Sequence, residues 1–250
     1  MIPPLGLTLF LLVVFSVAWG RAILFNADKR YMDSAAMWLM RYIRASKQHI
    51  HSVLVGCWYV GTGVAGIFVF SLVWNVGIFG QFRIAPSLLL YLPLGFLAEM
   101  SVSSLVMSTV MLVTPRTAWV DQIRSIPWIN AISLMPERLG PLIPLIGAFL
   151  EELFYRGVVF TLLVNGYPEL GMWGAAAISA ALFALQQILN TATLPQAVTM
   201  GIASVSISLM GCMLMAYTGS FLPALFAHEA FVVFYFKEMG FSYKTASFSG

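Results

Sequence analysis

Charged residues are scarce in this sequence: Asp, Glu, Lys and Arg make up 9% of the chain, against about a quarter of a soluble domain. Cysteine is scarce too. Cys57 and Cys212 lie in apolar stretches without CxxC spacing, which excludes a disulfide framework and a zinc site as the basis of the fold. The net charge is only +3, and the chain lacks the dense Lys/Arg block with interleaved aromatics that would predict nucleic-acid binding. Phosphate-binding glycine loops, HExxH and GxSxG are absent, so neither a metal nor a cofactor is predicted.

Apolar residues are abundant instead. The chain is 60% hydrophobic with a mean hydropathy of +0.89, and several runs of about 20 apolar residues are long enough to cross a bilayer as helices. We therefore predict an all-α, polytopic transmembrane bundle of about seven spans. The first run is interpreted as a retained helix rather than a signal peptide, because no basic segment precedes it and a long basic stretch follows it. The predicted spans are 3–20, 53–79, 85–113, 139–164, 171–189, 196–217 and 221–236.

Lys and Arg are concentrated in the connections 21–52 and 114–139 and in the C-terminal tail. By the positive-inside rule, these segments and the C-terminus are predicted to be cytoplasmic and the N-terminus to be outside. Within 21–52, apolar residues at helical spacing favour an amphipathic helix on the cytoplasmic membrane surface, and a solvated linker helix is the alternative. The predicted organisation is an N-terminal membrane region, 1–139, followed by a core, 140–250. The apolar residues of the amphipathic helix are Met32, Ala36, Leu39, Met40 and Ile43.

The stretch Glu151-Glu152-Leu153-Phe154-Tyr155-Arg156-Gly157 places two carboxylates and a guanidinium inside an apolar run. An ionisable group at bilayer depth costs a few kcal/mol, so it needs a partner or a function. Glu152 and Arg156 are four residues apart and can neutralise each other on one helical face. Glu151 is turned about 100° from Glu152 and has no charge partner in its own helix, which makes it a candidate general acid or base. The alternative is a packing network of all three groups between helices.

Three other predicted spans carry polar residues that can belong to the same site. Glu99 lies in mid-span, where a carboxylate is a functional candidate, and a protonated or serine-bonded structural group is the alternative. The fifth span carries Gln186-Gln187, and the seventh carries His228 and Glu229. A histidine that reaches Glu151 would provide an acid/base partner or an electrophile for a developing oxyanion. Its alternative is a polar tie between two helices.

The seven-residue stretch resembles the EExxxR signature of the CPBP family, the CAAX-protease and bacteriocin-processing group of glutamic intramembrane endopeptidases. This group includes the eukaryotic Ras-converting prenyl protease and many bacterial abortive-infection proteins. The resemblance covers about residues 140–236 and includes 219–228, which are similar to the last motif of the family. It implies a CPBP-like core for the second part of the chain.

The resemblance also implies roles, carried over by position. Glu151 would activate a water molecule, and Glu152 and Arg156 would support the site. His228 would stabilise the oxyanion. The implied substrate is a peptide or a membrane protein within the lipid bilayer.

The sequence departs from the family pattern at two positions. In the family, the histidine of an FxxxH motif helps the first glutamate to activate the water, and a closing motif pairs a histidine with a polar residue four positions later. Here Phe183 begins the FxxxH motif, but Gln187 takes the place of its histidine. Val232 takes the place of the polar residue that follows His228 in the closing motif. Glutamine can orient a water by hydrogen bonding, but it cannot accept and return a proton near neutral pH. Glu229 and Glu99 are the candidates to substitute for the missing groups.

Three functions follow from these observations. The first is an intramembrane glutamic endopeptidase with Glu151 as its base. The second is a catalytically impaired relative that acts as a binding or assembly subunit of a membrane complex. The EExxxR motif favours the first, and Gln187 and Val232 favour the second. The third is a transporter with Glu99, Glu151 and Glu229 as a proton relay, but the sequence lacks the repeated halves often found in carriers.

Overall fold

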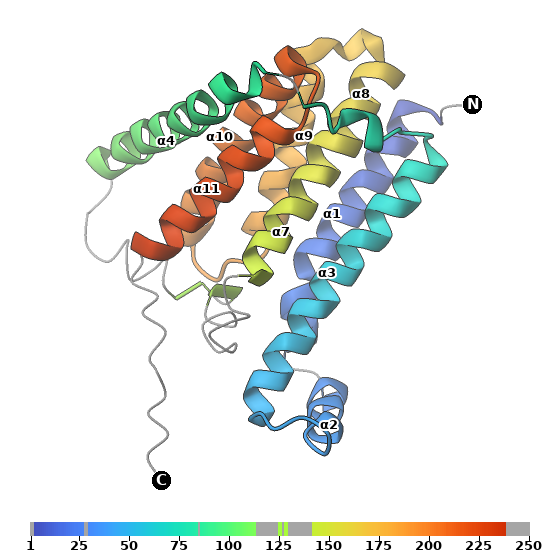
Figure 1. The fold of residues 1–250 in the computed structure, drawn as a ribbon, viewed down its shortest axis with the longest axis vertical. Coiled ribbons are helices and arrows are strands. Elements are labelled where there is room, and N and C mark those ends of the chain that lie inside the picture. Colours follow the sequence, from blue (N-terminus) through green and yellow to red (C-terminus); the bar gives the residue numbers. More distant parts are fainter. Residues whose placement is uncertain are drawn as a thin grey trace.

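The computed structural model of the chain describes residues 3–27, 30–84, 86–113, 125–126, 128–129 and 142–238. Every regular element in this part of the chain is helical, which confirms the predicted all-α class. Figure 1 shows the arrangement. The elements are α1 (Leu5–Ala27), α2 (Arg30–Leu39), α3 (Lys47–Val73), η1 (Phe79–Gln81), α4 (Leu88–Val113), α7 (Leu142–Glu152), η2 (Leu153–Phe160), α8 (Thr161–Gly166), η3 (Pro168–Leu170), α9 (Gly171–Ile188), α10 (Leu194–Thr218) and α11 (Leu222–Glu238).

Five stretches of the described residues are long and apolar enough to cross a membrane, namely α1, α3, α4, α9 with the preceding η3, and α10. The chain is an integral membrane protein. The predicted number of about seven spans is not confirmed. The apolar part of α11, Leu222–Phe234, is shorter than the other five. The predicted fourth span is divided into α7, η2 and α8, because its backbone changes to π-helical geometry at Leu153.

The first spanning helix is longer than predicted, and the second begins and ends six residues earlier than predicted, so the connection between them is shorter than predicted. α1 continues to Ala27 and α3 already begins at Lys47. The start of α3 is fixed by Ser46, whose side-chain oxygen accepts a hydrogen bond of 3.2 Å from the backbone N–H of His49. This N-cap satisfies one of the free donors of the first turn.

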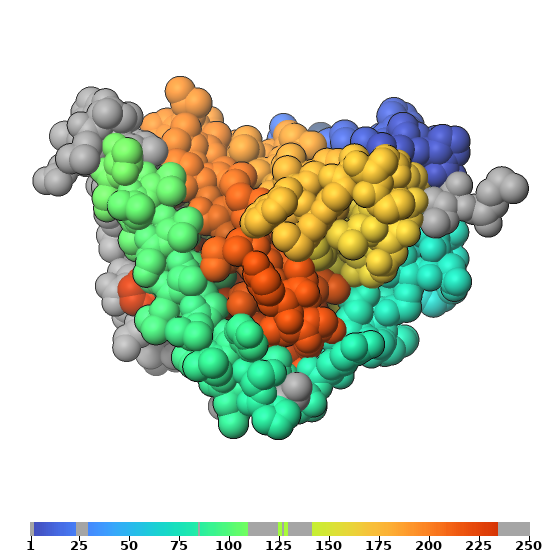
Figure 2. Space-filling model, turned by 90° about the horizontal axis from the view of Figure 1, so that it is seen from above, coloured from blue at the N-terminus to red at the C-terminus, as the bar shows by residue number. Residues whose placement is uncertain are grey.

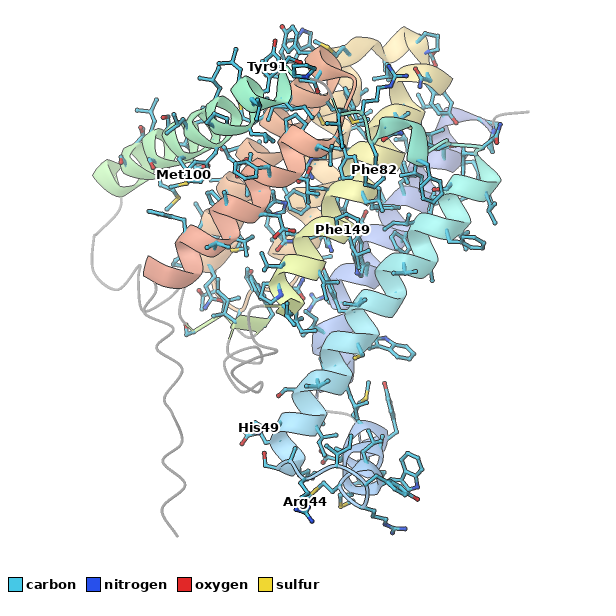
Figure 3. The ribbon with its side chains drawn as sticks, in the orientation of Figure 1. Arg44, His49, Phe82, Tyr91, Met100 and Phe149 are labelled. Carbon is cyan, nitrogen blue, oxygen red and sulfur yellow. The ribbon has the colours of Figure 1, made fainter. Side chains whose placement is uncertain are left out.

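Helix α2 folds back on the beginning of α3. Met32 and Ala36 of the predicted apolar face are buried, whereas Met40 and Ile43 are exposed. The buried residues of the predicted apolar face thus lie on α2, which packs against α3, and Met40 and Ile43, which follow α2, remain exposed. In Figure 3, Arg44 and His49 mark this end of the molecule, well apart from Phe149 in α7. The contact of α2 with the membrane surface remains a prediction.

The segment α7–η2–α8 occupies the centre of the bundle (Figure 1). η2 contacts α3, α9 and α10, and α7 contacts α3 on one side and α11 on the other. α4 covers α10 and α11. Seen from above in Figure 2, the C-terminal helices (orange-red) lie between α4 (green) and α8 (yellow). Residues of the EExxxR motif are thereby surrounded by helices from both parts of the chain.

Some sequence predictions fall on residues that lie outside the described part. These are Asp28 and Lys29 of the first basic connection, most of the connection 114–139, the predicted boundary between 139 and 140, and the tail after residue 238. The orientation of the termini across the membrane therefore stays a prediction.

Candidate functional site

The EExxxR motif lies where the central helix changes its geometry. Glu151 and Glu152 are the last residues of α7, and Arg156 belongs to the π-helical η2. The backbone stays helical across both junctions, with φ/ψ of −61°/−47° at Glu152 and −61°/−44° at Thr161. Short π-helical stretches inside helices are frequent at functional sites. Here the stretch follows directly after the two carboxylates.

A fully buried ionic cluster forms around Glu152. Its Oε1 lies 3.2 Å from Nη2 of Arg156 and 2.8 Å from Nδ1 of His228. Because a carboxylate accepts and cannot donate, the N–H of His228 Nδ1 donates to it. The side chains of Glu152 and Arg156 are 0% exposed, so each depends on the other for charge compensation. The predicted pairing of these two residues is present in the structure.

The guanidinium of Arg156 is enclosed by close packing. Its Cζ lies 4.9 Å from the ring centroid of Phe183, a cation–π contact. On another side it faces Gly211 of α10, where an added Cβ would come within 2.8 Å of Nε. Gly211 therefore gives the guanidinium room, and a larger residue there would require a shift of the guanidinium or of α10.

Glu151 has different partners from its neighbour. The hydroxyl of Tyr59 donates to its Oε1 at 2.5 Å, and Nε2 of Gln187 donates to the same oxygen at 2.8 Å. Tyr59 comes from α3 and Gln187 from the end of α9. No ion pair of Glu151 is present within the described residues. The absence of a charge partner in its own helix was predicted, and its hydrogen-bond partners come from two other helices.

A cavity of about 150 Å³ lies beside these groups. Glu151, Gln187 and His228 all line it, and Phe183 and Val232 lie in its wall. This volume is enough for several water molecules. The rest of its wall is mainly apolar, with Ile23, Met107, Ile129, Met200, Ile207 and Phe231 among the lining residues.

The remaining two predicted site residues lie outside the lining of this cavity. Glu99 of α4 is 1% exposed and interacts electrostatically with His228 and with the Glu152–Arg156 pair. Its Oε1 has no hydrogen-bond partner among the described residues. Glu229 lies in a separate groove between α11 and the beginning of α4, lined by Leu89, Leu222 and Phe226.

Sequence reasoning did not identify two members of the hydrogen-bond network as site residues. In the sequence, Tyr59 is an ordinary aromatic residue of an apolar span. Gln186 is the neighbour of the motif position Gln187, and its Nε2 donates to the Tyr59 hydroxyl at 2.8 Å. No local pattern marks either residue, because their contacts join positions 92 and 127 residues apart. Within the described residues, no group of three or more His, Cys, Asp or Glu side chains is arranged to hold a metal ion.

The second part of the chain matches a known protein family. Residues 138–234 match the family described as type II CAAX prenyl endopeptidase Rce1-like. This match confirms the family resemblance predicted from the EExxxR motif. Neither the curated proteins nor the solved structures gave a match. The α1–α4 part of the chain, including Tyr59, lies outside the matched segment.

Proposed function

We propose that the protein is a CAAX-type intramembrane endopeptidase that hydrolyses a peptide or membrane-protein substrate with a water activated by Glu151. The observation that carries this proposal is the convergence of Glu151, Gln187 and His228 on one cavity from three separate helices. The apolar wall of that cavity suits a substrate that arrives from the bilayer. The family match of residues 138–234 supports the same reaction class.

The proposed reaction uses Glu151 twice. As a general base, its carboxylate takes a proton from water while the water oxygen bonds to the scissile carbonyl carbon. The resulting tetrahedral intermediate carries its negative charge on the former carbonyl oxygen. Glu151, now a carboxylic acid, then returns the proton to the leaving nitrogen as the C–N bond breaks. Gln187 positions the carboxylate by donating to Oε1 and carries no proton in this scheme.

His228 is the proposed oxyanion partner. Its Nδ1–H is held by Glu152, which fixes the ring and stabilises the imidazolium form, and this form has a second N–H at Nε2. A donor of this kind, aimed at the developing oxyanion, typically contributes about 10²–10³ in rate. Arg156 neutralises Glu152 and keeps the pair in place.

The test is hydrolysis by the full chain in lipid nanodiscs, with a library of quenched fluorescent peptides in prenylated and unprenylated form. Replacement Glu151→Gln keeps the shape of the side chain and removes the base, so we expect cleavage to fall by about 10²–10⁴. Glu169→Gln is the matched control, because Glu169 is exposed in η3, and it should cleave like the wild type. Cleavage unaffected by Glu151→Gln would show that another group is the base.

A catalytically impaired binding or assembly subunit is the second candidate. The observation that favours it is the Gln187–Glu151 hydrogen bond, because an amide cannot relay the proton that a histidine there would relay. Val232 in the cavity wall likewise cannot bind an oxyanion. Replacements Gln187→His and Val232→Asn should raise cleavage if the protein is a slow protease. Inactivity of the wild type and of both variants, together with a stoichiometric membrane partner after detergent extraction, would favour the assembly role.

A further inference from the structure

Tyr59 brings a residue from outside the family-matched segment into the site. It belongs to α3, is 7% exposed, and lines the cavity beside Glu151. Its hydroxyl makes the shortest hydrogen bond to Glu151, at 2.5 Å. Tyr59 therefore contacts the proposed base directly, although it does not belong to the family motif.

The neighbouring amide fixes the direction of this hydrogen bond. Nε2 of Gln186 can only donate, and it lies 2.8 Å from the Tyr59 hydroxyl oxygen. The hydroxyl accepts that bond and gives its own hydrogen to Glu151 Oε1, which also accepts from Gln187. Oε1 of Glu151 therefore accepts two hydrogen bonds. Oε2 has no hydrogen-bond partner from the described residues and is the oxygen left for a water.

The ring of Tyr59 is itself held rigidly by α1. Trp19 stacks on it with a centroid distance of 5.3 Å and an interplanar angle of 27°. Nε1 of the same Trp19 donates to the Tyr59 backbone oxygen at 3.0 Å. Gly63, one turn further along α3, leaves the space for Trp19, since an added Cβ would come within 2.5 Å of its ring. Both the backbone and the ring of Tyr59 are thereby fixed before any substrate binds.

We infer that Tyr59 is a positioning residue for Glu151: its hydroxyl, oriented by Gln186, holds Oε1 so that Oε2 faces the reacting water. This inference rests on the proposed hydrolysis. It assigns the α1–α3 pair to the active unit, although the family match begins only at residue 138. The described geometry thus predicts that residues 138–234 alone do not make a complete site.

Tyr59→Phe is the direct test, because it keeps the ring and removes only the hydroxyl. A hydrogen bond to a charged group is worth about 10- to 100-fold, so we expect kcat to fall by that factor with KM nearly unchanged. Tyr167→Phe is the matched control. It removes a buried hydroxyl that bonds Thr8 Oγ1 at 2.6 Å and the Pro3 backbone oxygen at 2.7 Å, and Tyr167 is not among the residues that line the cavity.

A second measurement needs no activity. The melting temperature of the purified protein in detergent is compared for Tyr59→Phe in the wild-type background and in the Glu151→Gln background. A charge-assisted bond is stronger than a neutral one, so Tyr59→Phe should lower the melting temperature more in the wild-type background.

The outcomes separate the two proposals. Equal melting shifts in both backgrounds, or wild-type kcat in Tyr59→Phe, would overturn the role of Tyr59 and leave the proposed function standing. Equal losses of kcat in Tyr59→Phe and Tyr167→Phe would also overturn it, since they would indicate a general effect on folding. A wild type that cleaves nothing would overturn the proposed function and the catalytic role of Tyr59 together, and unequal melting shifts would then report a structural contact alone.

Discussion

Two ion pairs of nearly equal length lie in regions of opposite character. Arg156 and Glu152 are 3.2 Å apart in the centre of the bundle, with both side chains 0% exposed. Lys47 and Asp33 are 3.1 Å apart where α2 folds back on α3, with side chains 45% and 49% exposed. The two N···O distances differ by less than ordinary thermal displacements of protein atoms, so distance cannot decide which pair matters. Burial decides it.

The two pairs differ in whether water can solvate a charge that has lost its partner. A surface charge that loses its partner is solvated by water, so an exposed pair typically contributes about 0–1 kcal/mol. A buried charge that loses its partner stays uncompensated, and the loss is typically about 3–5 kcal/mol. The central pair also orients His228 through Glu152. We therefore expect an ion pair of the same chemistry to be important for stability in the centre of the bundle and nearly dispensable at the surface.

The largest effect is expected from Arg156→Met. Methionine keeps an unbranched apolar stem but has no charge, so the change leaves Glu152 buried with only His228 beside it. We expect the free energy of unfolding to fall by about 3–5 kcal/mol, measured by thermal denaturation in detergent. The double replacement Glu152→Gln with Arg156→Met removes the uncompensated charge and should recover part of the loss. If the single variant is as stable as the wild type, the contrast between the two regions is wrong.

A smaller effect is expected from Gly211→Ala, which tests the space around the guanidinium. The added Cβ would lie 2.8 Å from Arg156 Nε and 3.3 Å from the Cβ of Ala224. Overpacking of this kind costs about 1–3 kcal/mol. Gly61→Ala is the matched control, because nothing lies within 4 Å of its added Cβ, and better helix propensity should make it neutral or up to about 1 kcal/mol more stable. Equal stability of the two variants would mean that the guanidinium can move away.

The motif could be predicted from the sequence because its spacing is local. Glu152 and Arg156 are four apart in one helix, and an intramembrane charge is conspicuous in an apolar run. His228 was identified by the same rarity and by the family resemblance. Tyr59 could not be identified in this way, because an aromatic residue in an apolar span is ordinary and its contact with Glu151 depends on how α3 packs against α7.

The fold class was also predictable, but the division into spans was only partly so. Hydropathy detects length and apolarity, and these identified α1, α3, α4, α9 and α10. It cannot detect the change to π-helical geometry at Leu153, which depends on the backbone. It also cannot separate the two adjacent residues of α11, where His228 faces the cavity and Glu229 faces the outer groove.

The smallest effect is expected from Lys47→Met, the counterpart of Arg156→Met at the exposed pair. Asp33 keeps access to water and lies 3.8 Å from His51 Nε2, so we expect a loss of less than about 1 kcal/mol in the free energy of unfolding. The stability losses of Lys47→Met and Arg156→Met should respond differently to salt. At about 1 M salt the screening length is near 3 Å, so the small difference between Lys47→Met and the wild type should disappear. The buried pair excludes salt ions, and the loss in Arg156→Met should persist under the same conditions. A salt-sensitive loss in Arg156→Met would mean that the central cluster is open to water, and the cavity beside Glu151 would then have to be treated as part of a solvated channel.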